Sequence, residues 1–202
     1  PYSRFGDGRA VIRSSVREHL CGEAMFGLGI PSSRSLMLFG SNEPVMREET
    51  ERGAMIVRTA KTHIRFGHFE YFHHNKIADG VKTLLDHVID CYYPNTKQDS
   101  DKYLLFLDAT VKKTAHMVSA WQSVGFNHGV MNTDNMSILG ETFDYGPYAF
   151  METYNPNYIC NHTDSQGRYS FSNQPSIAEW NCYALASALI DLFSETELRD
   201  IL

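Results

Sequence analysis

Residues 125–137 read Gly-Phe-Asn-His-Gly-Val-Met-Asn-Thr-Asp-Asn-Met-Ser, and Asp144-Tyr145-Gly146 follows shortly after them. This polar passage comes directly after residues 101–124, where apolar side chains recur at helical spacing over the longest such segment of the chain. Asn, Asp and Gly are common in turns, because their side chains cap backbone groups and they tolerate left-handed conformations. Each of these residues alone indicates only a turn. Their combination after a long helix indicates a chemical site.

The spacing in this passage follows the protein-kinase pattern H-R-D-x-x-x-x-N followed by D-F-G. His128 and Asn135 stand at the matching separation, and Asp144 begins the matching triplet. Mg²⁺ prefers oxygen ligands, and an Asn amide and an Asp carboxylate supply them. The sequence therefore predicts a divalent-cation site on Asn135 and Asp144, with residues 137–139 forming a short hairpin strand between the two ligands.

One position departs from the kinase pattern. Val130 stands where a kinase has its catalytic aspartate, and a valine side chain can neither accept a proton nor orient a hydroxyl group. Asp134 occurs instead, immediately before the predicted metal ligand Asn135. Ordinary phosphoryl transfer on the usual plan is therefore disfavoured.

The rest of the chain predicts an α+β protein. The pattern indicates a helix from Ser14 or Ser15 to Gly27, two antiparallel strands and further helices. The expected strands are residues 35–39 and 54–60, joined by a turned link at 42–44, and the later helices are residues 77–92, 101–124 and 177–193. Trp121 and the leucines near it are expected in the core.

Composition excludes several classes of protein. The chain has 202 residues with a net charge of −6, whereas a nucleic-acid partner favours a clustered basic surface. No apolar run is long enough to span a bilayer. The four cysteines are scattered without C-x-x-C spacing, which argues against a zinc site or a disulfide framework and favours a reducing compartment.

Five longer strings are similar to the selenoprotein O family of pseudokinases. They are PYSRFGDGRA at 1–10, IRFGHFE at 64–70, HGVMNTDNMSILG at 128–140, DYGP at 144–147 and ICNH at 159–162. The resemblance implies a protein-kinase-like fold that binds ATP with Mg²⁺, or with Mn²⁺, in a flipped orientation. It also implies transfer of AMP, rather than phosphate, to Ser, Thr or Tyr hydroxyls of protein substrates.

The same resemblance implies roles for individual positions. Asp134 matches the catalytic base, and Asn135 and Asp144 match the metal ligands, with Asp144 also near the nucleotide. The other matching positions are Asp7 and Gly8 at the nucleotide, Arg58 and Arg65 at the phosphates, and Glu18 as the supporting helix glutamate that pairs with the nucleotide-site lysine.

Each of these assignments has a simpler alternative. Glu18 completes a Ser15-x-x-Glu18 capping box, and the residues around Asp7 can be a turn without further function. Arg58, which follows an apolar strand segment, can form a surface salt bridge. The histidines His68, His73 and His74 lie among aromatic residues, and packing explains them better than metal binding.

The resemblance also predicts that this sequence covers only part of a kinase-like fold. The family's glycine-rich loop, part of its N-lobe including the site lysine, and its C-terminal region, with a selenocysteine in some members, lie outside the 202 residues. Residues 1–60 are expected to be the remainder of the N-lobe, and residues 61–202 a mainly helical C-lobe. The 202 residues alone are expected to bind nucleotide weakly and to transfer little.

The leading hypothesis is a protein adenylyltransferase whose partners are ATP and hydroxyl-bearing proteins, with no nucleic acid or membrane partner. Two alternatives stay open: a protein kinase that uses Asp134 as a displaced base, and a nucleotide-binding pseudokinase scaffold without catalysis. The family resemblance places the protein in the cytoplasm of a bacterium or in a mitochondrion of a eukaryote.

Overall fold

A three-stranded antiparallel sheet forms the first part of the molecule. In this computed structural model, which describes residues 6–193, the strands are β1 (Ala10–Val11), β2 (Arg34–Met46) and β3 (Thr50–Thr59), in the order β1-β3-β2. The β2–β3 hairpin runs from the pair Arg34 and Thr59 to the pair Met46 and Thr50. Both expected strands are present and are longer than predicted. The expected link at 42–44 instead lies inside β2, where the register shifts, because Pro44 cannot donate to the ladder.

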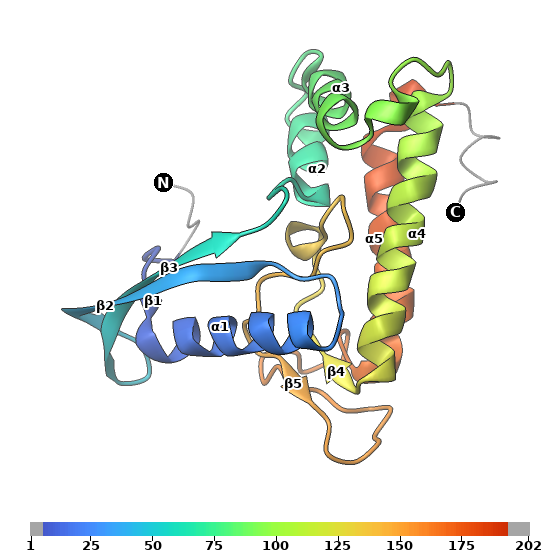
Figure 1. The fold of residues 1–202 in the computed structure, drawn as a ribbon. Coiled ribbons are helices and arrows are strands. Elements are labelled where there is room, and N and C mark those ends of the chain that lie inside the picture. The colour runs from blue at the N-terminus through green and yellow to red at the C-terminus, as the bar shows by residue number, and fades with distance from the viewer. Residues whose placement is uncertain (1–5, 194–202) are drawn as a thin grey trace.

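Helix α1 (Ile12–Gly27) lies along this sheet (Figure 1). It begins directly after β1, with Val11 as the N-cap residue and no side-chain cap. The predicted start at Ser14 or Ser15 is therefore wrong, and so is the capping box, because Ser15 lies buried inside the first turns of the helix. The chain passes from strand to helix without the polar loop that a capping residue would need.

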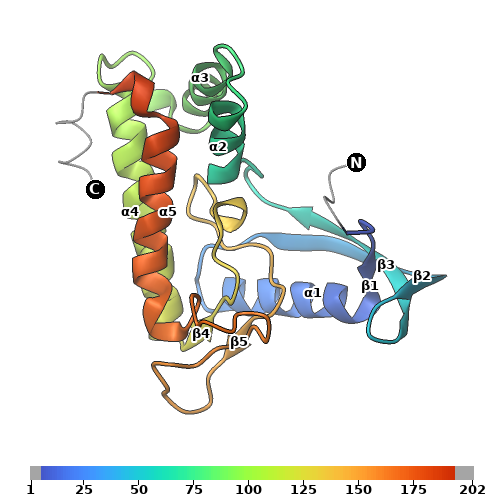
Figure 2. The same cartoon turned by 180° about the vertical axis from the view of Figure 1, so that it is seen from behind.

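The second part of the molecule is mainly helical. Its helices are α2 (Phe66–His74), α3 (Gly80–Tyr92), α4 (Lys102–Ser123) and α5 (Gln174–Ala188). The short 3₁₀ helices are η1 (Pro94–Thr96), η2 (Thr133–Asn135), η3 (Phe171–Asn173) and η4 (Ile190–Leu192). Helices α4 and α5 run side by side, and α2 and α3 lie near one end of this pair (Figures 1 and 2). The mixture of sheet and helices confirms the predicted α+β class.

One hydrophobic core joins the two parts. It includes Cys21 and Met25 of α1 together with Phe106 and Trp121 of α4, all nearly inaccessible to solvent. Trp121 also donates a hydrogen bond from Nε1 to Thr142 Oγ1 at 2.8 Å, so α4 holds the passage that follows it. The prediction that Trp121 belongs to the core is confirmed.

The polar passage lies between the sheet and the helix pair (Figures 1 and 2). It is bounded by the strand pair β4 (Phe126–Asn127) and β5 (Ala149–Phe150). Residues 137–139 do not form the predicted strand: Ser137 makes one isolated bridge with Arg65, and Phe66 N donates to Met136 O at 3.0 Å. The partner of this segment is therefore the entry to α2, rather than a hairpin within the passage.

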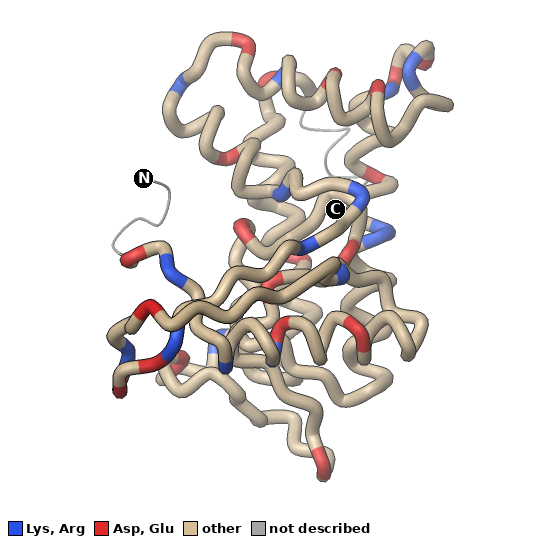
Figure 3. Tube along the Cα trace, turned by 60° about the vertical axis from the view of Figure 1, so that its left-hand side comes forward, with Lys and Arg blue, Asp and Glu red and all other residues tan. Residues whose placement is uncertain are grey.

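Charged residues of both signs lie close together at the far end of the sheet, around the turn between β2 and β3 (Figure 3). Among the helices of residues 6–193, none combines the length and the apolar character that spanning a bilayer requires.

Candidate active site

Two loops form the candidate site, and His128 joins them. Its ring is fully buried against Trp121, and Nε2 donates to Phe143 O at 3.1 Å, while Nδ1 accepts from Val130 N at 3.4 Å. Phe143 immediately precedes Asp144. A neutral imidazole with its proton on Nε2 therefore holds the loop of Asp134 and Asn135 against the loop of Asp144.

Burial lowers the pKa of His128, because a charged ring would lose its hydration. Below its ordinary pKa of 6.5 the unfolded chain takes up a proton that the folded ring resists, so stability present above that pH is lost as the pH falls. We expect the free energy of unfolding to decline below pH 6.5 by at most about 1.4 kcal/mol per pH unit for this ring. Urea titrations across pH 5–8 measure this slope.

The comparison variant is His128→Phe, which keeps an aromatic ring but cannot titrate. Burial also lowers the pKa of His63 and of His68, so some acid sensitivity is expected to remain in the variant. An unchanged slope in His128→Phe would show that the ring is not responsible.

Helix α5 fixes the first loop through two buried amides. Gln174 accepts from His128 N and donates to Phe126 O, both at 2.9 Å, and Asn181 donates to Met131 O at 2.9 Å. These side-chain contacts satisfy backbone groups that an irregular buried segment would otherwise leave without hydrogen bonds. The loop is consequently held on a rigid helix on both sides of Val130.

Asn135 is buried and is oriented by its own loop. Its Nδ2 donates to Val130 O at 2.9 Å, and its backbone N donates to Asn132 O at 2.9 Å. Since the amide nitrogen is committed to a carbonyl, the geometry fixes which end of the side chain is Oδ1. That oxygen is the atom a hard cation would require.

Asp144 has a left-handed backbone, with φ of 71°, and its side chain is half exposed. Its Oδ1 lies 3.4 Å from Arg58 Nη2, a loose contact that leaves room for another partner. Within residues 6–193 there is no group of three or more His, Cys, Asp or Glu residues that could hold a metal ion. An Asn amide with an Asp carboxylate offers two hard oxygen donors, and such a set fits Mg²⁺ when phosphate and water oxygens complete the shell.

Glu18 connects α1 to both the sheet and the second loop. Its Oε1 lies 2.6 Å from Arg58 Nη2, and its Oε2 accepts from Tyr145 N at 2.7 Å. Burial raises the pKa of Glu18, and the neighbouring Arg58 works against this rise. The carboxylate of Glu18 therefore does not cap its own helix. It bonds to Tyr145, which lies 127 positions later in the sequence.

We expect Glu18→Gln to lower the free energy of unfolding by about 2 kcal/mol, because it leaves the guanidinium of Arg58 without its closest carboxylate. Glu23→Gln on the same helix is the matched control. Glu23 pairs with Arg34 on the surface, where solvent screens the charges, so its loss should cost clearly less than the loss of Glu18. Equal losses in urea titrations of the two variants would contradict a special role for Glu18.

Arg58 and Arg65 lie in one neighbourhood. Burial lowers the pKa of His63 most, and the positive charges of Arg58 and Arg65 lower it further. Arg65 also stacks over Phe143 at 5.8 Å and donates from Nη1 to Asp134 O at 2.7 Å. Among the described residues, the buried Nε of each arginine has no hydrogen-bond partner. The two guanidiniums therefore lie near neighbouring residues of the second loop, Arg58 at Asp144 and Arg65 at Phe143.

Asp134 lies in η2, against the first turn of α2. A Cβ atom built on Gly67 would stand 2.3 Å from Asp134 Oδ1, which is closer than any real contact. Only glycine at position 67 therefore permits the observed position of this carboxylate. Arg65 contacts Asp134 O and the ring of Phe143, so it lies between the two loops, and Arg58 contacts Asp144 on the second loop. The two predicted metal ligands, Asn135 and Asp144, lie on the two loops that His128 joins, and they make no direct contact with each other.

Gly67→Ala is expected to lower any reaction that depends on Asp134 by about 10- to 100-fold, because displacement of a reacting group by about 1 Å has effects of this size. Stability should change little, because the displaced atom is the end of a side chain and the cost of moving it is offset by the higher helix propensity of alanine, which is worth up to about 1 kcal/mol. Gly27→Ala is the control, because a Cβ at Gly27 meets no atom within 4 Å. Equal activity of the two variants in single-turnover assays would refute this assignment.

Asp7 and Gly8 lie beside the sheet, where Asp7 contacts the turn between β2 and β3. Arg47 Nη1 lies 2.8 Å from Asp7 Oδ2, and this arginine together with the backbone N–H of Arg9 lowers the pKa of Asp7 to about 2. Gly8 has φ of 70° and lines a cavity of about 700 Å³ beside β2 and β3. Their assignment to nucleotide binding stays a prediction.

Sequence reasoning gave no site role to three residues that the structure makes important. Arg47 and Gly67 act through contacts with residues far away in sequence, which no local pattern reveals. Gln174 was predicted to lie outside the last helix but is its first residue. His128 was recognised as part of the motif, and its spacing from Asn135 was the available signal.

The chain is similar over its whole length to known proteins of one family. The family model described as protein adenylyltransferase SelO matches residues 1–202. A protein nucleotidyltransferase YdiU of Erwinia tasmaniensis is 57% identical over 202 residues, which is 100% of this chain and 42% of that protein. The YdiU proteins of Vibrio cholerae serotype O1 and Burkholderia vietnamiensis are 57% and 56% identical over 199 and 192 residues, covering 98% and 95% of this chain. The chain spans 41% and 37% of these two relatives.

Proposed function

Because the chain belongs to the SelO family of protein adenylyltransferases, which has a kinase-like fold, we propose that the protein transfers AMP from ATP to Ser, Thr or Tyr hydroxyls of proteins. The single observation that carries the proposal is the pair of loops joined by His128, with Asn135 on one loop, Asp144 on the other and Arg58 beside Asp144. Oxygen ligands and guanidiniums at one place suit a metal-bound triphosphate.

Asp134 is proposed to accept the proton of the attacking hydroxyl, which then bonds to the α-phosphate as pyrophosphate leaves. Arg58 and Arg65 are proposed to bind phosphate oxygens through their forked donors. Val130 contributes its backbone carbonyl to Asn135 and has no side-chain group that could act as a base. This distribution of groups supports transfer with Asp134 as the base and not the kinase plan, in which the base would stand at position 130.

Asn135 and Asp144 are proposed to hold Mg²⁺, or Mn²⁺, which shares its oxygen ligation. When bound, such an ion supplies positive charge that offsets the charge of the phosphates. Glu18 is proposed to position Arg58 and the backbone of Tyr145. Asp7 and Gly8 are proposed to contact the nucleotide from the sheet side.

The division into residues 1–60 and 61–202 belongs to the same proposal, with the sheet and α1 in the first part. So do the partners, which are ATP and hydroxyl-bearing proteins and not nucleic acid or membranes. The proposed compartment is the cytoplasm in a bacterium or the mitochondrion in a eukaryote.

The test is incubation of the intact protein and a protein acceptor with Mg²⁺ and ATP labelled on either the α- or the γ-phosphate, followed by intact-mass analysis. We expect label from the α-phosphate and the mass of one AMP on the acceptor. Label from the γ-phosphate would favour the kinase alternative. Nucleotide binding without any label on protein would favour the non-catalytic scaffold.

A further inference from the structure

A groove runs between α2 and the loop that carries Asp134. Its volume is about 440 Å³. One wall is α2 with the residue after it, and the other is the start of η2. The lining residues are Gly67, Glu70, Tyr71, His74, Asn75, Asn132, Thr133 and Asp134. We call this feature the α2 groove.

The α2 groove is a built feature and not a chance gap between helices. Phe66 and Phe69 on the opposite face of α2 are fully buried, and they fix the helix against the core. The N-terminal end of α2 is further held by Phe66 N, which donates to Met136 O just beyond Asn135. The position of the groove wall is therefore set by the same backbone that sets the position of Asp134.

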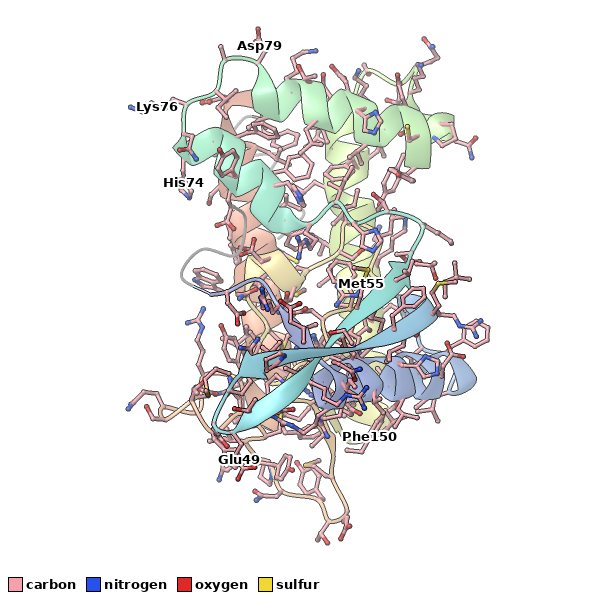
Figure 4. All side chains as sticks on the ribbon, turned by 90° about the vertical axis from the view of Figure 1, so that its left-hand side faces the viewer. Glu49, Met55, His74, Lys76, Asp79 and Phe150 are labelled. Carbon is pink, nitrogen blue, oxygen red and sulfur yellow. The ribbon has the colours of Figure 1, made fainter. Side chains whose placement is uncertain are left out.

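The side chains of the groove are polar, and one aromatic ring stands open to solvent. Tyr71 is 60% exposed. Glu70 is half-buried, and no ion pair or hydrogen bond of its carboxylate occurs within residues 6–193. Together with Asp134, it gives the groove two carboxylates. His74 stands at the end of α2 (Figure 4) and also lines the groove.

We propose that the α2 groove binds the segment of the acceptor protein that carries the modified hydroxyl, and that Glu70 selects acceptors with a Lys or Arg close to that hydroxyl. The inference rests on the proposed function, because it takes Asp134 as the base. A hydroxyl that gives its proton to Asp134 must approach from a space bordering this carboxylate, and the α2 groove is such a space. A basic side chain in the same segment would then meet the carboxylate of Glu70.

The exposed ring of Tyr71 suits the stem of a Lys or Arg side chain or the backbone of an extended segment. An acidic segment would place like charges beside Glu70 and Asp134, which is unfavourable. The specificity expected is therefore for hydroxyls in basic surroundings. Gly67 contributes too, since a side chain at this position would collide with Asp134 Oδ1 on the groove wall.

The experiment uses the intact protein and a pair of synthetic peptides with one Ser, Thr and Tyr each in a Gly-Ala background. One peptide carries Arg residues around the hydroxyls, and the other carries Glu at the same positions. Transfer from ATP labelled on the α-phosphate is measured as kcat/KM. We expect the wild type to prefer the Arg peptide by about two- to fivefold, which corresponds to one partly exposed charge pair.

Glu70→Lys is expected to abolish or reverse this preference, and Glu70→Gln to reduce it. The affinity for ATP with Mg²⁺, measured by calorimetry, should stay within about twofold in both variants. A general disturbance of the fold would lower this affinity as well. Glu152→Lys is the matched control, because Glu152 is exposed and does not line the α2 groove.

The outcomes separate this inference from the proposed function. If the wild type labels proteins or peptides from the α-phosphate but both Glu70 variants keep the full preference for the Arg peptide, the role of Glu70 is overturned and the proposed function stands. Equal labelling of the two peptides by the wild type has the same consequence. If no protein or peptide takes label from the α-phosphate, the proposed function and this inference both fail.

Discussion

Asp134→Asn is expected to lower AMP transfer by roughly two to four orders of magnitude, the usual contribution of a general base. Asparagine keeps the size of the side chain and can occupy the same place beside Gly67, so the loss would follow from the missing basic oxygen. Arg65 bonds to the backbone carbonyl of residue 134, and this contact does not depend on the side chain. The fold and the cation pair should therefore survive the substitution.

Single-turnover transfer to a saturating acceptor measures this effect, and calorimetry with ATP and Mg²⁺ provides the second readout. The affinity for nucleotide should change by no more than about twofold. Asp108→Asn on α4 is the matched control. Within residues 6–193, Asp108 pairs with Lys112 on the surface and with no other cation, and its loss should cost about 0.5 kcal/mol or less in stability. Transfer by Asp134→Asn above about a tenth of the wild-type rate would remove Asp134 from the role of base.

Much of the fold follows from periodicity. The helix predicted at 101–124 differs from α4 by only one residue at each end, because its apolar side chains recur over many turns and the polar passage ends it sharply. Both long strands were predicted where β2 and β3 occur. In contrast, α2 was not predicted, since a short segment rich in histidine and aromatic rings has no clear helical stripe. Its stability comes from Phe66 and Phe69 in the core.

The failures near the site have a common physical cause, which is contact between distant parts of the chain. The pattern around Glu18 has the form of a capping box, yet its carboxylate bonds to the backbone of Tyr145 and to Arg58. Residues 137–139 were assigned a hairpin strand because kinases place one there, yet Ser137 bridges to Arg65 instead. Sequence spacing predicted which residues carry chemistry. The contacts that position them depend on tertiary packing, which spacing does not reveal.

Asp144→Asn is expected to lower transfer by roughly two to three orders of magnitude and to raise the concentration of Mg²⁺ needed for half-maximal binding of ATP. The substitution removes one of the two anionic oxygens offered to the metal and keeps the other as an amide oxygen. Asparagine is the informative choice, because residue 144 has φ of 71° and asparagine tolerates the left-handed conformation. The backbone of the loop, and with it the contact from Tyr145 N to Glu18, should remain in place.

Asp144→Ala tests the same carboxylate with an added backbone cost of about 1–2 kcal/mol, since alanine is disfavoured at this φ. Comparing the two variants separates strain from charge: transfer should be low in both, whereas stability in urea should fall only in the alanine variant. Titration of ATP binding with Mg²⁺ and with Mn²⁺ gives the metal dependence directly. If Asp144→Asn binds ATP at the same metal concentration as the wild type, Asp144 does not ligate the ion. The metal site would then have to be sought among the contacts of Asn135 and the two arginines.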